Sequence, residues 1–151
     1  MRDQLHVMEE PVVTPWGFKF AGNIAMAQGT FEPMEAELVR NILKDIDVMV
    51  DIGANVGFYT CLARSKGIYT IAVEPFMPNM DYLYANLCAN GWNDVEVYPI
   101  GLASKPGLDN LYVAGTGASL LKGWAGASPL MRHTICATLA TSGHNRFFLG
   151  L

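Results

Sequence analysis

The stretch VMVDIGANVGFYT, residues 48–60, decides the fold. It predicts a buried strand over 48–52, then a turn bounded by Gly53 and Gly57, then a helix. Glycine in such a turn permits a positive φ and lets a ligand approach the main chain. The strand is apolar yet carries a carboxylate near its end, Asp51. That carboxylate raises the question of what group it contacts.

The same alternation of strand and helix continues on both sides of this stretch. Short connections between alternating strands and helices are typical of a parallel α/β sheet, with successive strands as neighbours. After residue 114 the pattern weakens, because a Gly/Ala/Ser-rich segment expected to be a loop follows. The expected strands are 48–53, 68–75, 95–103 and 108–114, with 134–140 as one more candidate, and the expected helices are 29–47, 56–65 and 79–89.

The first of these helices carries a start signal and an apolar stripe. Pro33 suits the first turn of a helix, where its missing N–H costs nothing. Met34, Leu38, Ile42 and Ile46 recur at helical spacing. That spacing predicts that their side of the helix packs against the sheet.

The composition indicates a folded chain without a basic surface. Of its 151 residues, 51% are hydrophobic and 16% are charged, which excludes a disordered chain. The formal net charge is -4 and no cluster of Lys and Arg occurs, so nucleic acid is not an expected partner. No apolar run approaches the ~20 residues that span a bilayer, and the N-terminus lacks a signal-peptide core. No membrane association is expected.

The cysteines and histidines predict neither a disulfide framework nor a metal site. The three cysteines are far apart and have no C-x-x-C spacing, and the three histidines are scattered. Such cysteine usage predicts a reducing compartment, the cytoplasm.

Two carboxylates are expected at neighbouring strand ends, Asp51 and Glu74. In an open parallel sheet, ligands bind beyond the carboxyl ends of the strands, near the point where the strand order reverses. An acidic residue at the end of the second strand can accept hydrogen bonds from both hydroxyls of a ribose. The amides that open the following helix favour an anionic group. The pattern predicts a nucleoside-bearing ligand with an anionic end.

Two ligand families fit this site, and a third interpretation needs no ligand. A dinucleotide site requires G-x-G-x-x-G, whereas the spacing here is D-x-G-x-x-x-G without the middle glycine. S-adenosylmethionine carries a carboxylate and an ammonium in place of pyrophosphate, and a strand-end carboxylate helps to hold the ammonium. If S-adenosylmethionine is the ligand, Asp51 has a function, because it helps to hold the ammonium. In the third interpretation the glycines only permit a tight strand-to-helix turn.

The sequence resembles the FkbM family of S-adenosylmethionine-dependent methyltransferases over about residues 11–121. The resemblance rests on VDIGANVGFYT and on IAVEPFMPNMDYLYANLCANG, which carries E-P-x3-N-x3-L-x2-N. TPWGFKF, GTFEPMEAELVRNIL and VEVYPIGLASKPG follow the order that the family shows. The resemblance implies an α/β, Rossmann-like class I methyltransferase fold with a parallel sheet core that is incomplete at the C-terminal side. We expect an N-terminal extension with a short hairpin over 1–30 and a partial S-adenosylmethionine-binding domain over 31–151.

The resemblance also implies the cofactor-binding residues. Glu74 would accept the ribose hydroxyls, and Phe76 and Leu102 would flank the adenine. Leu102 stands where many related enzymes have an acidic residue for the adenine amine, so adenine recognition would depend on packing and backbone groups. The residues expected around the methionine end are Asp51, Gly53, Ala54, Asn55 and Gly57.

The sequence departs from the family near its end. Family members continue with a TLD-like stretch and a strand that ends in D-x-E-G, whereas Ala140 stands here where an aspartate is expected. No catalytic base can be named from these residues. An unfinished sheet leaves an edge strand unpaired, which predicts either a homo-oligomer or a soft, aggregation-prone chain.

Three hypotheses for function follow. The first is O-methyl transfer from S-adenosylmethionine to a hydroxyl of a small molecule or sugar. The second is a truncated, non-catalytic remnant that binds a nucleoside or serves as an interaction module. The third is an NAD(P)-dependent oxidoreductase, which the missing middle glycine disfavours.

Overall fold

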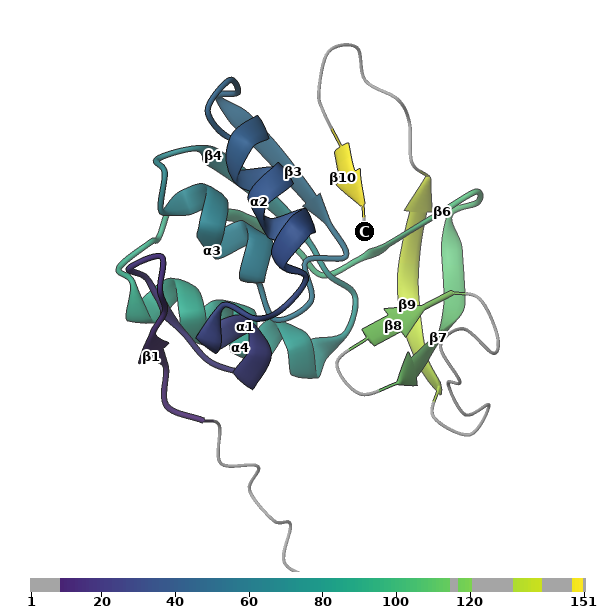
Figure 1. Ribbon diagram of the computed structural model, residues 1–151. Coiled ribbons are helices and arrows are strands. Elements are labelled where there is room, and N and C mark those ends of the chain that lie inside the picture. The colour runs from purple at the N-terminus through teal and green to yellow at the C-terminus, as the bar shows by residue number, and fades with distance from the viewer. Residues whose placement is uncertain (1–8, 115–116, 121–131, 140–147, 151) are drawn as a thin grey trace, which may run out of the picture.

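The structure is a computed structural model that describes residues 9–114, 117–120, 132–139 and 148–150 (Figure 1). In Figure 1 the four helices lie together on one side of the molecule, and strands β6 to β9 lie on the other. The elements are β1 (Val12–Val13), β2 (Lys19–Phe20), α1 (Ile24–Gln28), α2 (Pro33–Ile42), β3 (Val48–Ile52), α3 (Phe58–Arg64), β4 (Tyr69–Val73), α4 (Met77–Ala89), β5 (Glu96–Tyr98), β6 (Gly101–Ala103), β7 (Gly107–Ala114), β8 (Gly117–Ser119), β9 (Arg132–Leu139) and β10 (Phe148–Gly150).

The first sheet is parallel throughout and has the strand order β10-β3-β4-β5. The chain runs outward from β3 through β4 to β5, with α3 and α4 as the crossovers, and β10 later pairs with the other edge of β3. The strand order therefore reverses between β3 and β10, which is where ligands bind in open α/β sheets. The predicted Rossmann-like α/β class with a parallel core is confirmed.

The prediction of one continuous strand over 95–103 is wrong. The segment divides into β5 and β6, which belong to different sheets. Pro99 separates them, and the amide of Ile100 donates to the carbonyl of Tyr98 at 2.9 Å, which closes a tight three-residue turn. Proline has no N–H for a ladder and its fixed φ suits such a turn. The chain is thereby directed out of the first sheet.

The second sheet has the order β6-β9-β7-β8. β6 pairs with β9 in parallel, and the other two pairings are antiparallel. β7 corresponds to the strand expected over 108–114, and β9 to the candidate at 134–140. Ala140, where the family comparison expects an aspartate, lies outside the described residues.

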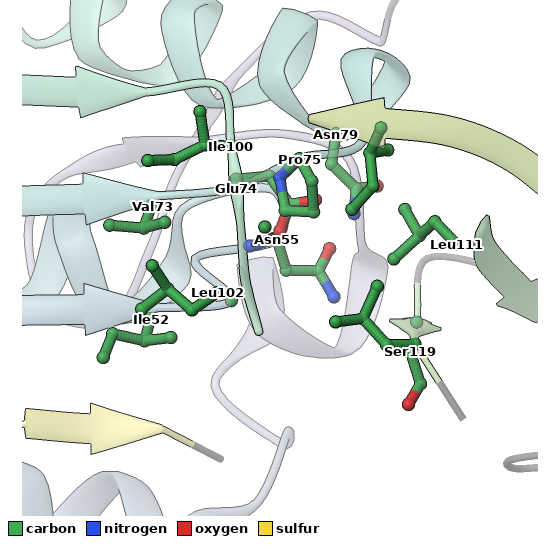
Figure 2. A pocket seen from close by; sticks show the side chains of 15 residues that line it. Ile52, Asn55, Val73, Glu74, Pro75, Asn79, Ile100, Leu102, Leu111 and Ser119 are labelled. Carbon is green, nitrogen blue, oxygen red and sulfur yellow. Dashed lines mark hydrogen bonds between the residues drawn. The ribbon is translucent and has the colours of Figure 1, made fainter. Parts of the chain in front are cut away.

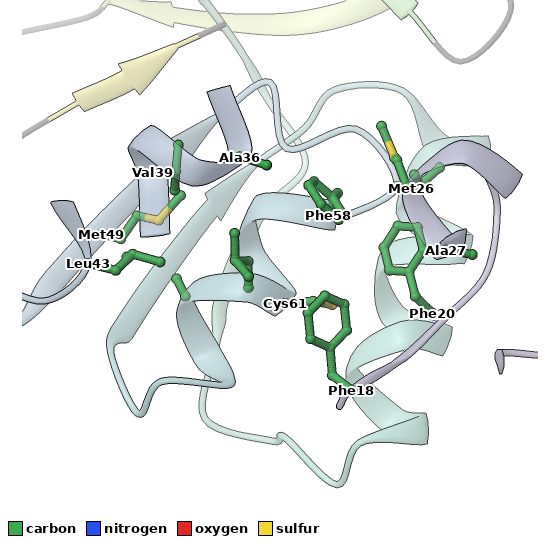
Figure 3. Packing of buried hydrophobic residues seen from close by; sticks show 13 residues of the cluster. Phe18, Phe20, Met26, Ala27, Ala36, Val39, Leu43, Met49, Phe58 and Cys61 are labelled. Carbon is green, nitrogen blue, oxygen red and sulfur yellow. The ribbon is translucent and has the colours of Figure 1, made fainter. Parts of the chain in front are cut away.

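The main core joins the N-terminal segment to α3 (Figure 3). Phe18, Phe20, Met26 and Phe58 are all nearly inaccessible to solvent. The rings of Phe20 and Phe58 meet edge to face with their centroids 5.8 Å apart, a favourable aromatic geometry. The strand β2 and the helix α1 therefore belong to the same hydrophobic core as the parallel sheet.

The apolar stripe predicted for the first helix is wrong at its first two positions, whereas Ile46 packs against the core. Met34 is 81% exposed and Leu38 is 59% exposed. The helix instead buries Ala36 and Val39, with Leu43 just beyond its end, which also recur at helical spacing. Ala36 and Val39 lie in the same hydrophobic core cluster as residues of α3, so packing decides between two stripes that periodicity alone cannot separate.

The two faces of the parallel sheet differ in their cover. Met49 and Ala72 point to the helices and are buried. Part of the opposite face stays open, because Val48 is 37% exposed and both Tyr69 and Tyr98 are 44% exposed. Parallel sheets are ordinarily covered on both faces. In the described part of the chain, no helix is long and apolar enough to cross a membrane.

Candidate functional site

A cleft of about 230 Å³ opens at the carboxyl ends of β3 and β4 (Figure 2). Its floor comes from the first sheet and its far wall from the second, and its lining includes Ile52 and Gly53 at the end of β3, one of the two strands between which the strand order reverses. The lining residues are Ile52, Gly53, Asn55, Val73, Glu74, Pro75, Asn79, Ile100, Gly101, Leu102, Leu111, Gly117, Ser119, Leu120 and Ile135.

Glu74 forms the polar end of the cleft. It is 3% exposed, and its carboxylate receives the amides of Phe76 on Oε1 and Asn55 on Oε2, both at 2.8 Å. The side chain of Asn79 also hydrogen-bonds to it. Burial raises the pKa of Glu74, and these three hydrogen bonds oppose that rise because they stabilise the charged form. The carboxylate therefore has a fixed orientation at the end of β4.

The loop over 53–57 uses all five of its backbone amides within the protein. Asn55 adopts a left-handed conformation with φ 54°, as do the two glycines that bound the loop. The amide bonds run from Gly53 and Ala54 to the carbonyl of Val73, from Asn55 to Glu74, from Val56 to the side chain of Asn55, and from Gly57 to the carbonyl of Ala54. No amide of this loop is therefore left for an anionic group, and the expectation for the amides that open α3 stays a prediction.

Asp51 lies beneath the loop and not in the lining of the cleft. It is 5% exposed and accepts a hydrogen bond of 2.5 Å from the hydroxyl of Thr60 in α3. Burial is the largest influence on its titration and raises the pKa of Asp51 to about 6, while bonds from Thr60 partly oppose the shift. The contact with Thr60 answers the question of how a buried strand accommodates this carboxylate.

The titration of Asp51 should appear in the pH dependence of stability. Its pKa is higher in the folded chain, about 6, than its ordinary value of 3.8, so the folded state binds the proton more tightly. The free energy of unfolding, relative to that of the Asp51→Asn variant, should therefore fall as the pH rises from about 4 to about 6. Urea denaturation of both proteins across this range measures the difference. A difference that stays constant with pH contradicts the assignment.

The predicted site residues divide into two groups. Gly53, Asn55, Glu74 and Leu102 line the cleft. The other four lie behind it and are buried or tightly packed. They are Asp51, Ala54, Gly57 and Phe76.

Three of the residues behind the cleft serve packing. Ala54 packs in a core cluster that contains Leu83. A Cβ added to Gly57 would lie 2.4 Å from Cδ1 of Leu83, so the glycine permits the close approach of the loop to α4. Phe76 packs against residues of the second sheet, among them Leu111.

Sequence reasoning missed the apolar far wall of the cleft. Leu111, Leu120 and Ile135 come from or follow the strands β7, β8 and β9, which pair across long sequence separations. No local pattern marks such residues as neighbours of Glu74. Asn79 was also missed as a lining residue, although its fixed spacing after Glu74 placed it within reach. Across the described residues, no group of three or more His, Cys, Asp or Glu side chains is placed to hold a metal ion.

Comparisons with known proteins give similarities of structure alone. No family model matches the chain, and no curated protein matches it. Among solved structures, it is similar to a SAM-dependent methyltransferase from Agrobacterium tumefaciens, with 13% identity and a TM-score of 0.48. It is also similar to a protein from Pyrococcus horikoshii named as a transferase, with 18% identity and a TM-score of 0.44.

Each likeness covers 70% of this chain and 44% of the other. The chain thus spans less than half the length of either protein. Similarities at this level carry no functional conclusion, and the fold assignment above follows from the strand order.

Proposed function

We propose that the chain is an S-adenosylmethionine-dependent methyltransferase of FkbM type that methylates a hydroxyl of a small molecule or sugar. The observation that carries the proposal is the oriented carboxylate of Glu74 at the polar end of a cleft whose far wall is apolar. A carboxylate at the end of the second strand suits the hydroxyls of a ribose. An apolar wall suits the base beyond it, because burying an uncharged aromatic ring is favourable.

The state of the loop amides supports S-adenosylmethionine over a dinucleotide. A pyrophosphate binds to backbone amides that point at it. All five amides of the loop over 53–57 have partners inside the protein. Asp51 beneath the loop adds negative charge, which opposes pyrophosphate and favours an ammonium.

The roles proposed for the chain's residues are binding and positioning. Glu74 holds the ribose, and Leu102 contacts the adenine by packing, with Phe76 supporting the wall from behind. When bound, the cofactor supplies an electrophilic methyl group on a sulfonium. Catalysis then depends on holding that carbon in line with the acceptor oxygen. The cysteine usage still predicts the cytoplasm as the compartment.

A second candidate function is nucleoside binding without turnover. Among the described residues that line the cleft, Glu74 alone has a titratable side chain. If ribose recognition occupies it, those residues leave no general base for the acceptor hydroxyl. Incubation with S-adenosylmethionine and a library of hydroxylated acceptors separates the candidates, since repeated methyl transfer excludes the second.

A thermal melt with S-adenosylhomocysteine tests the cofactor site itself. At about 100 times its dissociation constant, a ligand that binds only the folded state adds ~2.7 kcal/mol to its stability. The midpoint should rise with S-adenosylhomocysteine and not with NAD. Glu74→Gln should abolish the rise, because its NH2 group would face one of the two amides that the carboxylate now receives. Glu35→Gln changes an exposed carboxylate on α2 and is the matched control. A rise that survives Glu74→Gln contradicts the proposed site.

A further inference from the structure

Three donors converge on the carboxylate of Glu74, and each comes from a different place. One is the amide of Asn55 in the loop after β3, and the second is the amide of Phe76 at the entrance to α4. The third is the side chain of Asn79 in the first turn of α4. A carboxylate has about four acceptor positions. Three occupied positions leave about one, whereas a ribose offers two neighbouring hydroxyls.

Asn79 is placed to supply the missing contact. It is 4% exposed, and it lines the same cleft as Glu74. Its backbone amide donates to the carbonyl of Phe76 at 3.0 Å, which fixes the residue in the helix. Figure 2 shows it beside Pro75 at the polar end of the cleft. An amide side chain can both donate and accept, so it can bond to a carboxylate and to a hydroxyl together.

We propose that Glu74 and Asn79 read the two ribose hydroxyls as a pair, Glu74 accepting one hydroxyl and the Asn79 amide binding the other. The inference rests on the proposed function, because it concerns the same ligand. It assigns to Asn79 a direct contact in place of a purely structural function in α4. It also predicts that the contribution of one hydroxyl to binding depends on Glu74 and that of the other on Asn79.

Ligands that lack one hydroxyl provide the test. The probes are S-adenosylhomocysteine and its 2′-deoxy and 3′-deoxy analogues, with dissociation constants measured by calorimetry. For the unmodified protein, loss of either hydroxyl should weaken binding about tenfold, the usual effect of one lost hydrogen bond to such a site. In Asn79→Ala, one of these two penalties should vanish and the other should persist.

The controls separate binding from folding. Asp81→Ala changes an exposed residue of the same helix and should keep both penalties. Asn79→Leu is similar in size but has no hydrogen-bonding group, and it serves if the alanine variant does not melt cooperatively. If Asn79→Ala or Asn79→Leu keeps both penalties, or lowers them equally, Glu74 reads both hydroxyls and the inference is overturned. If the unmodified protein binds none of the probes, the proposed function itself fails, which is a distinct result.

Discussion

Replacing Asn86 with alanine should lower the free energy of unfolding by about 4 kcal/mol. Asn86 is fully buried in α4, and its side chain clamps two other segments to that helix. It accepts the amide of Ala21 at 2.8 Å and donates to the carbonyls of Ala21 at 3.0 Å and Val56 at 2.9 Å. Truncation leaves three buried backbone groups without partners, and each costs about 1–3 kcal/mol.

Asn90→Ala is the matched control for this prediction. Asn90 lies one turn further along and makes a similar clamp, to the amide and the carbonyl of Lys19 at 2.8 and 2.7 Å. Its two bonds to Lys19 lie at the surface, where water can replace the lost partner, and a third bond, to the carbonyl of Asn86 at 2.8 Å, is only partly buried, so we expect a loss of about 1 kcal/mol. Urea denaturation of both variants measures the difference. If the two variants lose the same free energy of unfolding, the burial of the Asn86 hydrogen bonds adds nothing to stability.

The second large effect is expected for Gly57→Ala, with a loss of about 3 kcal/mol. Gly57 has φ +90°, a conformation that costs a residue with a Cβ about 1–2 kcal/mol. The added Cβ would also lie 2.4 Å from Cδ1 of Leu83, which is fully buried. Leu83 must move within a packed core, and such overpacking costs about 1–3 kcal/mol.

Gly67→Ala separates the two causes. Gly67 has φ +78°, similar to that of Gly57, but its added Cβ would meet open space. This variant should therefore lose only the backbone contribution, about 1 kcal/mol. The comparison uses the same denaturation experiment for both variants. If the two glycines give the same loss, the contact with Leu83 is not what requires glycine at position 57.

Local signals account for the parts of the fold that the sequence predicts. The strand β3, its glycine turn and α3 follow one another within 48–64, and β4 and α4 follow within 69–89. Each pair buries its apolar face through contacts between neighbouring elements, so periodicity and turn residues suffice. The parallel order of β3, β4 and β5 then follows from the alternation.

The parts that escaped prediction depend on contacts between distant residues. Pro99 marks the break between β5 and β6, but the pairing of β6 with β9, which places β6 in the second sheet, spans more than 30 residues of sequence. The orientation of α2 depends on the surface of α3, against which Ala36 and Val39 fit better than Met34 and Leu38. Local periodicity contains no term for either contact.

The candidate site divides in the same way. Glu74 and Asn55 could be predicted because strand ends and glycine turns mark them. The apolar wall could not, because Leu111 and Ile135 reach the cleft only through the pairing of β7 with β9. Asp51 can be buried beneath the loop because Thr60 donates a hydrogen bond to it, and the sequence does not reveal this contact.

The partly open face of the parallel sheet should leave a calorimetric signature. Unfolding raises the heat capacity in proportion to the apolar surface that becomes newly hydrated, ~12–15 cal/mol/K per residue for ordinary domains. Val48, Tyr69 and Tyr98 already meet water in the folded chain, so they add less to that increment. The curve of stability against temperature should accordingly be less sharply curved than that of an ordinary domain of 151 residues. Stability would then change more gradually with temperature on either side of its maximum.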